Sequence, residues 1–113
     1  MPKDNKVYLL HILDAISQIE KYTGSMDYGA FMQNMLVQDG VIRQLEIIGE
    51  ATKRLTPDFR LRHSVIPWKD VAGMRDKLIH DYLGVDIDAV WDTVKKDLPL
   101  LKEYTKKLLD EGL

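Results

Sequence analysis

Apolar residues recur at helical spacing along almost the whole chain, and this periodicity constrains the fold more than any other feature. Amphipathic stripes lie within residues 5–22, from about 27 to 55, and within 67–83 and 87–109. Runs of alternating β-branched residues, which would indicate strands, are absent from the sequence. The pattern therefore predicts an all-α, up-and-down four-helix bundle with short loops and mostly antiparallel neighbours.

Capping residues predict where these helices begin. The expected N-caps are Asp4, Asp27, Thr56 and Asp86. Pro57 follows the third of these caps, so DFRLRH is predicted to form one short extra helix before Ser64. Pro67 is expected to open the helix that Gly84 closes.

Glycine and proline predict interruptions inside two of the helices. Gly40 is a candidate kink in the second helix. Pro99 should kink or break the last helix, because proline removes a backbone donor and clashes with the preceding turn. The long helices are therefore not all expected to be straight.

The chain has 113 residues and no cysteine, which suits one compact domain over residues 1–113. Without cysteine, a disulfide framework and thiol catalysis are both excluded. The first apolar stretch is interrupted by His11, Asp14 and Gln18, so it resembles neither a secretory signal nor a membrane span. We therefore expect a soluble cytoplasmic protein that does not bind membranes.

Charge is distributed unevenly along the chain. The net charge is −2, which at face value argues against a nucleic-acid binder. Residues 43–77, however, hold eight basic and five acidic residues and include all five arginines: Arg43, Arg54, Arg60, Arg62 and Arg75. Arginine suits phosphate, so this segment could form an electropositive groove. The alternative is a solvated face with ion pairs, such as Glu50 with Arg54.

The stretch RDKLIHDY, residues 75–82, is the most reactive-looking part of the sequence. Metal-independent cleavage of RNA needs a group that titrates near neutral pH and a cation that stabilises the phosphorane. His80 and Arg75 supply these two types. On an ideal helix, however, about 140° separates their side chains, whereas Tyr82 would lie almost beneath Arg75. A local distortion or a two-fold dimer with a shared pocket would remove this difficulty, and we favour the dimer.

Each residue of this motif also has a purely structural interpretation. His80 could bond to Asp81 or to a backbone carbonyl, and Arg75 could pair with a neighbouring carboxylate. Tyr82 could be an ordinary half-buried aromatic residue. Composition alone nevertheless predicts only about 0.006 chance occurrences of Arg-x4-His-x-Tyr in such a chain.

The surroundings of the motif resemble a known family. The stretches VIRQLEIIGEATKRL (41–55) and IPWKDVAGMRDKLIHDYLGVDIDAVWDTVKKDLPLL (66–101) are similar to the HepT-like family of HEPN (higher eukaryotes and prokaryotes nucleotide-binding) proteins. The first helix is similar more loosely, so the resemblance covers nearly the whole chain. It implies an all-α homodimer with a composite active site.

The resemblance also implies a function. It indicates the toxin of a toxin–antitoxin pair, a ribonuclease without metal or cofactor that cleaves transfer or messenger RNA. The implied partner is a minimal nucleotidyltransferase antitoxin. The family motif maps onto Arg75 and His80 as the catalytic pair, Asp76 as the supporting polar residue, and Tyr82 as the site of AMP attachment. Weaker candidates for RNA-backbone contacts are Arg43, Arg54, Arg60 and Arg62.

Several other residues are interpreted first as structural. Packing in the core or at an interface is expected for Phe31, Met32, Met35, Trp68 and Trp91. Close helix packing is expected for Gly49, and an ion pair for Glu50. Asp86 and Asp88 fit helix capping better than a metal site.

Two other functions are compatible with the sequence. The chain could be a non-catalytic helical subunit that binds nucleotide or substrate for a nucleotidyltransferase, with Arg75 as a phosphate clamp. It could also be a dimeric helical scaffold in which the motif is structural. An RNA cleavage assay separates both of these from a ribonuclease.

Overall fold

The computed structural model describes residues 5–80 and 84–111, and of Ile79 and His80 it describes the backbone. Within this part of the chain the elements are α1 (Asn5–Thr23), α2 (Tyr28–Met32), α3 (Met35–Arg54), α4 (Pro57–Arg62), α5 (Trp68–Ala72), α6 (Met74–Leu78), β1 (Ile79–His80), β2 (Gly84–Val85), α7 (Ile87–Asp92), the π-helical turn η1 (Thr93–Asp97) and α8 (Leu98–Asp110). The all-α class is therefore confirmed, with one small antiparallel strand pair added. None of the described helices is long and apolar enough to cross a membrane.

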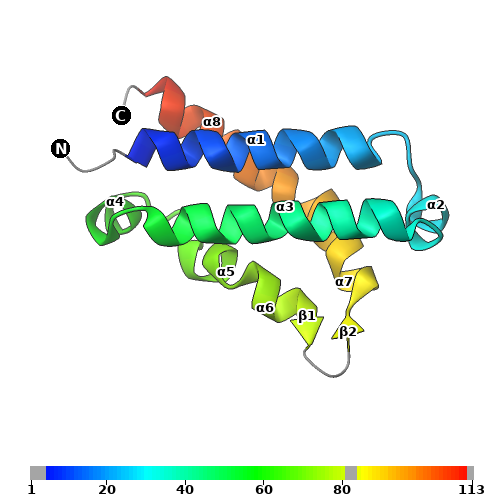
Figure 1. Cartoon of the computed structure of the whole chain (residues 1–113). Helices are drawn as coiled ribbons and strands as arrows, with labels where there is room; N and C mark the ends of the chain where they lie inside the picture. Colours follow the sequence, from blue (N-terminus) through cyan, green and yellow to red (C-terminus); the bar gives the residue numbers. More distant parts are fainter. Residues whose placement is uncertain (1–4, 81–83, 112–113) are drawn as a thin grey trace.

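The two longest helices, α1 and α3, run antiparallel and side by side (Figure 1). Helix α8 packs on α1, whereas α5 and α6 pack on α3. Figure 1 shows α5 and α6 returning along α3 toward the strand pair, which lies at one edge of the molecule. This arrangement places helix α6, which carries Arg75, beside α3.

The core lies where the apolar stripes of the long helices meet. Fully or almost fully buried side chains in this contact are Leu9, Ile12, Ile16 and Ile19 of α1 and Val41, Leu45 and Ile48 of α3. Each such side chain stabilises the fold by about 1.5–3 kcal/mol relative to an exposed position. Their spacing confirms the helical periodicity predicted for both segments.

Three of the predicted N-caps are confirmed. The side chains of Asp27, Thr56 and Asp86 accept hydrogen bonds from the backbone N–H groups three residues later, at 2.8, 3.2 and 3.0 Å. Each satisfies a donor that the first helical turn would leave unpaired. Asp4 lies outside the described residues.

The second predicted helix is divided in two. Helix α2 ends at Met32, and Asn34 caps α3 by accepting a hydrogen bond from the Val37 N–H at 3.0 Å. Helix α3 is continuous through Gly40, so this glycine does not break the helix, and the kink itself stays a prediction. A Cβ at Gly40 would lie 3.2 Å from the Tyr22 ring, so the glycine accommodates a packed aromatic side chain.

The third predicted helix, residues 67–83, is also wrong in its extent. It is interrupted at Gly73, and helix α6 ends at Leu78, where β1 begins. Strand β1 pairs with β2 in the register Ile79 with Val85 and His80 with Gly84. Gly84 has a φ of 82°, a conformation that suits glycine and allows the chain to return as a strand. The β-branched Ile79 also favours an extended backbone.

Pro99 changes the type of helix without ending it. The π-helical turn η1 directly precedes α8, in which Pro99 occupies the first turn. Because proline has no N–H for the carbonyl four residues earlier and its ring crowds that carbonyl, a wider turn relieves the clash. The predicted interruption is confirmed, but the chain remains helical through it.

Candidate active site

Helix α6 presents Arg75 on the surface because its apolar residues anchor the opposite side. Met74 and Leu78, one turn apart, are buried in the core, and the residues between them are exposed. The Arg75 side chain is 46% exposed. The cation of the motif is therefore accessible to a ligand.

The guanidinium of Arg75 is held by Glu46 of α3. Arg75 Nε donates to Glu46 Oε2 at 2.8 Å, and Nη1 lies 3.5 Å from Asp76 Oδ1. The hydrogen bond from Arg75 to Glu46 is the main reason that the pKa of Arg75 is raised above its usual range. The ion pair expected under the structural interpretation thus exists, and it engages Nε, whereas Nη1 has only the long contact with Asp76.

This arrangement suits binding of a phosphate group. A contact through Nε fixes the plane of the guanidinium, and the two terminal nitrogens can then donate to two phosphate oxygens. Asp76 contributes only a long contact to Nη1, at the limit of hydrogen bonding. The supporting role predicted for Asp76 therefore stays a prediction, and Glu46 is the residue that orients Arg75.

The backbone of His80 lies in β1, immediately after the helix that carries Arg75. Because α6 ends at Leu78, the angular separation expected on one continuous helix does not apply to Arg75 and His80. The Asp86 N–H donates to the Leu78 carbonyl at 2.9 Å, which stabilises the point where the helix changes into the strand. Tyr82 and Asp81 lie outside the described residues.

A family model with the description "Ribonuclease HepT-like" matches residues 12–108 of the chain, including all of α6, β1 and β2. The chain belongs to the HepT-like ribonuclease family. The match includes Arg75, His80 and Tyr82, so this HepT-like chain carries the whole motif inside the matched region.

Individual relatives of this HepT-like chain have high identity. A protein of Methanocaldococcus jannaschii, named as a gamma-glutamylcyclotransferase and candidate RNase, is 50% identical over 111 residues, which are 98% of this chain and 50% of that relative. The chain thus spans half the length of that protein. A Thermococcus cleftensis protein named as a probable ribonuclease HepT is 47% identical over 108 residues, covering 96% of this chain and 98% of the relative. No solved structure matches the chain significantly.

The other arginines of the HepT-like chain lie in different surroundings. Arg43 and Arg54 line a surface depression between α1 and α3. Arg62 pairs with Asp58 at 3.3 Å on α4, and the Arg60 Nε is buried without a hydrogen-bond partner among the described residues. The structure therefore does not bring the four candidate RNA contacts together in one cluster.

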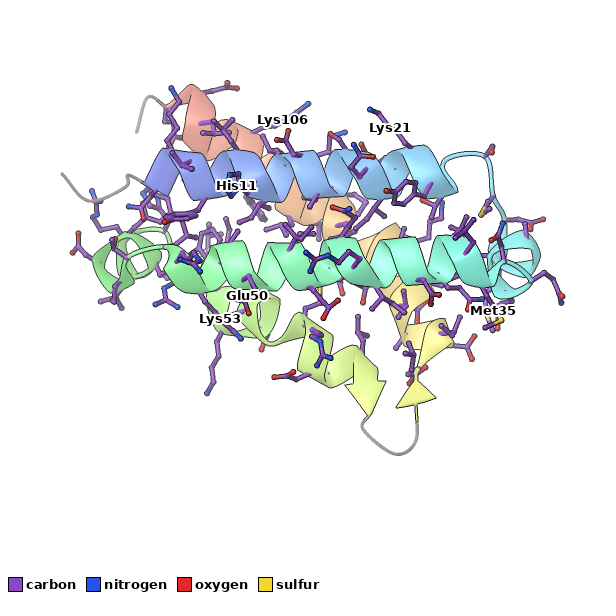
Figure 2. All side chains as sticks on the ribbon, viewed as in Figure 1. His11, Lys21, Met35, Glu50, Lys53 and Lys106 are labelled. Carbon is purple, nitrogen blue, oxygen red and sulfur yellow. The ribbon has the colours of Figure 1, made fainter. Side chains whose placement is uncertain are left out.

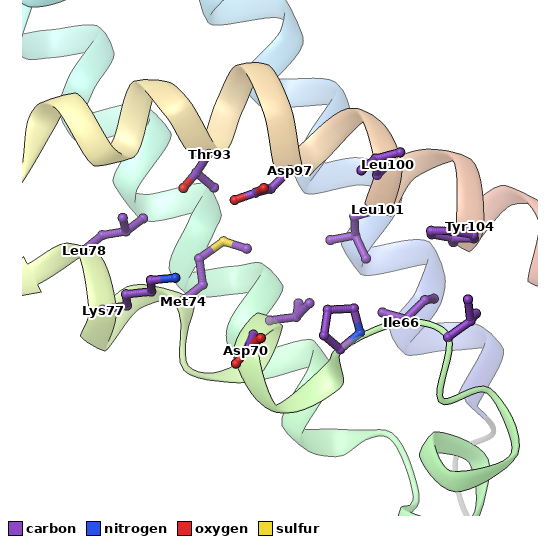
Figure 3. Close-up of a pocket in the computed structure, with 13 residues that line it drawn as sticks. Ile66, Asp70, Met74, Lys77, Leu78, Thr93, Asp97, Leu100, Leu101 and Tyr104 are labelled. Carbon is purple, nitrogen blue, oxygen red and sulfur yellow. The ribbon is translucent and has the colours of Figure 1, made fainter.

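A larger pocket of about 420 Å³ lies on the other side of α6, between α5 and α6 on one side and the π turn and α8 on the other (Figure 3). Its polar lining includes Asp70, Lys77 and Asp97, and its walls are mostly apolar. Lys77 rather than Arg75 contributes to this pocket, so the pocket and the Arg75 guanidinium are distinct. The larger of these two pockets therefore does not contain the Arg75 of the motif.

Most residues interpreted as structural are confirmed in that role. Phe31 and Trp68 are buried in the core, and Trp91 is half-buried with its ring 4.9 Å from Phe31. A Cβ at Gly49 would lie 3.1 Å from the Ala72 carbonyl, which confirms close packing of α3 against α5.

Two details differ from the structural expectations. Glu50 pairs with Lys53 at 3.7 Å, not with Arg54. Met35 does not pack in the core: its side chain is 74% exposed and that of Leu36 is 83% exposed, because both precede the first buried residue of α3.

The acidic residues near the strand pair act in helix capping and hydrogen bonding. Asp86 caps α7, and Asp88 accepts a hydrogen bond from the Tyr28 hydroxyl. In the described part of the chain, no three His, Asp or Glu side chains are grouped as metal ligands. Asp86 and Asp88 thus form hydrogen bonds within the fold.

Proposed function

We propose that this chain is the toxin of a toxin–antitoxin pair and cleaves RNA as a metal-independent endonuclease. The observation that carries the proposal is the Arg75-x4-His80-x-Tyr82 motif in a HepT-like ribonuclease chain, with the Arg75 guanidinium accessible and oriented by Glu46. Transfer and messenger RNA are both candidate substrates. The ribonuclease names of the relatives support the same reaction class.

In the proposed reaction, Arg75 binds the scissile phosphate and stabilises the charge that develops on the phosphorane. His80 accepts the proton of the 2′-hydroxyl, whose oxygen attacks the phosphorus, and returns a proton to the departing 5′-oxygen. The products are a 2′,3′-cyclic phosphate and a 5′-hydroxyl. Asp76, adjacent to Arg75, supports the position of the cation.

The proposed active form is a homodimer of HEPN-like four-helix units. In it, two copies of the motif face one pocket, so that residues of both chains act on one RNA. A chain of this size offers little enclosed volume for a substrate as large as RNA, which favours a shared site. The exposed apolar side chains of Met35 and Leu36 provide one surface that association could cover.

The proposed partner is a minimal nucleotidyltransferase that transfers AMP from ATP to the Tyr82 hydroxyl and releases pyrophosphate. Tyr82 is two residues from His80, so the added phosphate would place negative charge beside the RNA phosphate. The AMP group would also fill space in the same pocket. Inhibition would therefore be both electrostatic and steric.

The direct test is incubation of the purified chain with total RNA in EDTA. Wild type should cut the RNA, and His80→Ala should not. Cleavage that persists unchanged in His80→Ala would contradict the role of His80. A wild-type protein that binds nucleotide and leaves all RNA intact would favour the non-catalytic subunit.

A further inference from the structure

A shallow depression of about 310 Å³ lies between α1 and α3, and neither Arg75 nor Glu46 lines it. Tyr8 and His11 line it from α1, and Arg43, Glu50 and Arg54 line it from α3. Figure 2 shows His11 on α1 and Glu50 on the neighbouring α3. The depression thus combines two arginines with a histidine and an aromatic ring.

Arg43 and Arg54 are the arginines of this depression, and neither forms an ion pair or hydrogen bond with a side chain in the described parts of the protein. Arg62 and Arg75, by comparison, each contact a carboxylate. An exposed guanidinium without a carboxylate partner keeps all of its donors for an external anion. Phosphate oxygens are the anions that match this fork of donors best.

The spacing of the two arginines on α3 indicates an extended ligand. The two arginines are eleven positions apart, so their Cα atoms lie about 16 Å apart along the helix and within about 20° of the same face. Both side chains lean toward the N-terminus of the helix, so they do not converge on one point. They would therefore contact different phosphates of one strand.

The remaining polar groups favour an anionic ligand despite the presence of one carboxylate. Glu50 is compensated by Lys53, whose Nζ lies 3.7 Å from its Oε1. The exposed His11 ring packs edge-on against Tyr8, with ring centroids 6.1 Å apart and an angle of 82°. The imidazole can donate an N–H to a phosphate between the two arginines.

The depression and the candidate active site share helix α3. Glu46, which holds Arg75, lies three residues after Arg43 and about 60° around α3. A strand that contacts Arg54 and Arg43 along α3 would therefore pass near Arg75, because Glu46 lies between the two arginines along the helix. We propose that the depression lined by His11, Arg43 and Arg54 is a subsite for the phosphate backbone of single-stranded RNA, a proposal that rests on the ribonuclease function proposed above.

The test measures binding separately from cleavage. A fluorescent 2′-O-methyl oligoribonucleotide, which lacks the attacking hydroxyl, is titrated with the full chain at several KCl concentrations and followed by anisotropy. Arg43→Ala and Arg54→Ala should each raise the Kd about tenfold, which corresponds to one lost charge-assisted hydrogen bond. Each should also lower the slope of log K against log salt by about 0.7.

Two further variants make the test specific. Glu50→Gln should lower the Kd, because it removes the negative charge of the depression and frees Lys53. Lys106→Ala is the matched control, since it removes one positive charge from the exposed surface of α8, and its Kd should stay within about twofold of wild type. Thermal melting by circular dichroism confirms that every variant is folded.

The possible results separate this proposal from the function on which it rests. Wild type that cuts RNA, together with an Arg43→Ala/Arg54→Ala protein whose Kd and salt slope are unchanged, would overturn the subsite alone. A higher Kd for Glu50→Gln would also overturn the proposed subsite, because removal of a negative charge should strengthen the binding of an anionic strand. Wild type that neither binds nor cuts RNA would overturn both the subsite and the ribonuclease.

Discussion

The Arg75 guanidinium is held through Nε by Glu46, a carboxylate on another helix that lies 29 residues earlier in the chain. This pairing joins α6 to α3 beside the point where α6 changes into β1. It fixes the orientation of the cation while the Arg75 side chain remains 46% exposed. The geometry therefore gives Glu46 a positioning role toward Arg75, the proposed phosphate ligand.

Replacing Glu46 should affect turnover more than binding. Glu46→Ala is expected to lower the kcat of RNA cleavage about tenfold to a hundredfold, because a misdirected guanidinium stabilises the transition state poorly. The KM should stay unchanged or fall, since a negative charge near RNA is lost. Steady-state kinetics on a defined RNA measures both constants.

Two variants control the Glu46 experiment. Glu46→Gln keeps an oxygen that accepts from Arg75 Nε and should recover most of the kcat. Glu103→Ala removes an exposed carboxylate from α8 and should match wild type. An unchanged kcat in Glu46→Ala would show that Arg75 needs no such orientation.

The close contact of α3 with α5 should make Gly49 sensitive to substitution. Gly49→Ala places a Cβ 3.1 Å from the Ala72 carbonyl oxygen, so the backbone there must shift by a few tenths of an ångström, and the free energy of unfolding should fall by about 1–3 kcal/mol. Gly29→Ala is the control, because its Cβ would meet only Asp27 Oδ1 at 3.6 Å. Urea denaturation of both variants checks this, and equal stability would refute the tight contact.

The hydrogen bond from Tyr28 to Asp88 gives a prediction about pH. Accepting this bond, Asp88 raises the pKa of Tyr28 above its ordinary value of about 10. Because the folded-state pKa is raised, the resulting stabilisation is complete below the ordinary value and is lost as pH rises through the folded-state value. Phenolate absorbance should show Tyr28 ionising at lower pH in Asp88→Asn, with Tyr28→Phe identifying the signal. An identical titration in Asp88→Asn would exclude this hydrogen bond in solution.

Modification of Tyr82 should be visible by intact mass. Coexpression with a minimal nucleotidyltransferase from the same genome is expected to add mass in AMP-sized steps and to abolish RNA cleavage. Tyr82→Phe lacks the hydroxyl that accepts AMP, so it should show no addition. Retention of the additions in Tyr82→Phe would place the modification on another residue.

The sequence alone predicts where most of the helices lie, but it does not predict where α6 ends near the candidate site. The stripes of α1 and α3 and the caps at Asp27, Thr56 and Asp86 depend on local spacing, so the sequence alone predicts them. The end of α6 at Leu78 depends on pairing with residues 84–85 and on the positive φ of Gly84, which helical periodicity does not reveal.

Glu46 could not have been predicted from sequence as the partner of Arg75. The two residues meet only because α5 and α6 pack on α3 at a particular register, which depends on the tertiary fold. The positions of the arginines likewise depend on the tertiary fold. All five arginines lie within residues 43–77, yet Arg43 and Arg54 line the depression beside α1, whereas Arg75 pairs with Glu46.

The central claim is that Arg75 and His80 act together on one RNA phosphate, and single-turnover cleavage of a defined RNA in EDTA tests it most directly. Arg75→Ala and His80→Ala should each lower the rate constant by at least about a hundredfold, and the double variant should be little slower than either single variant, as for residues that act as a unit. Either single variant cleaving at the wild-type rate would contradict the account.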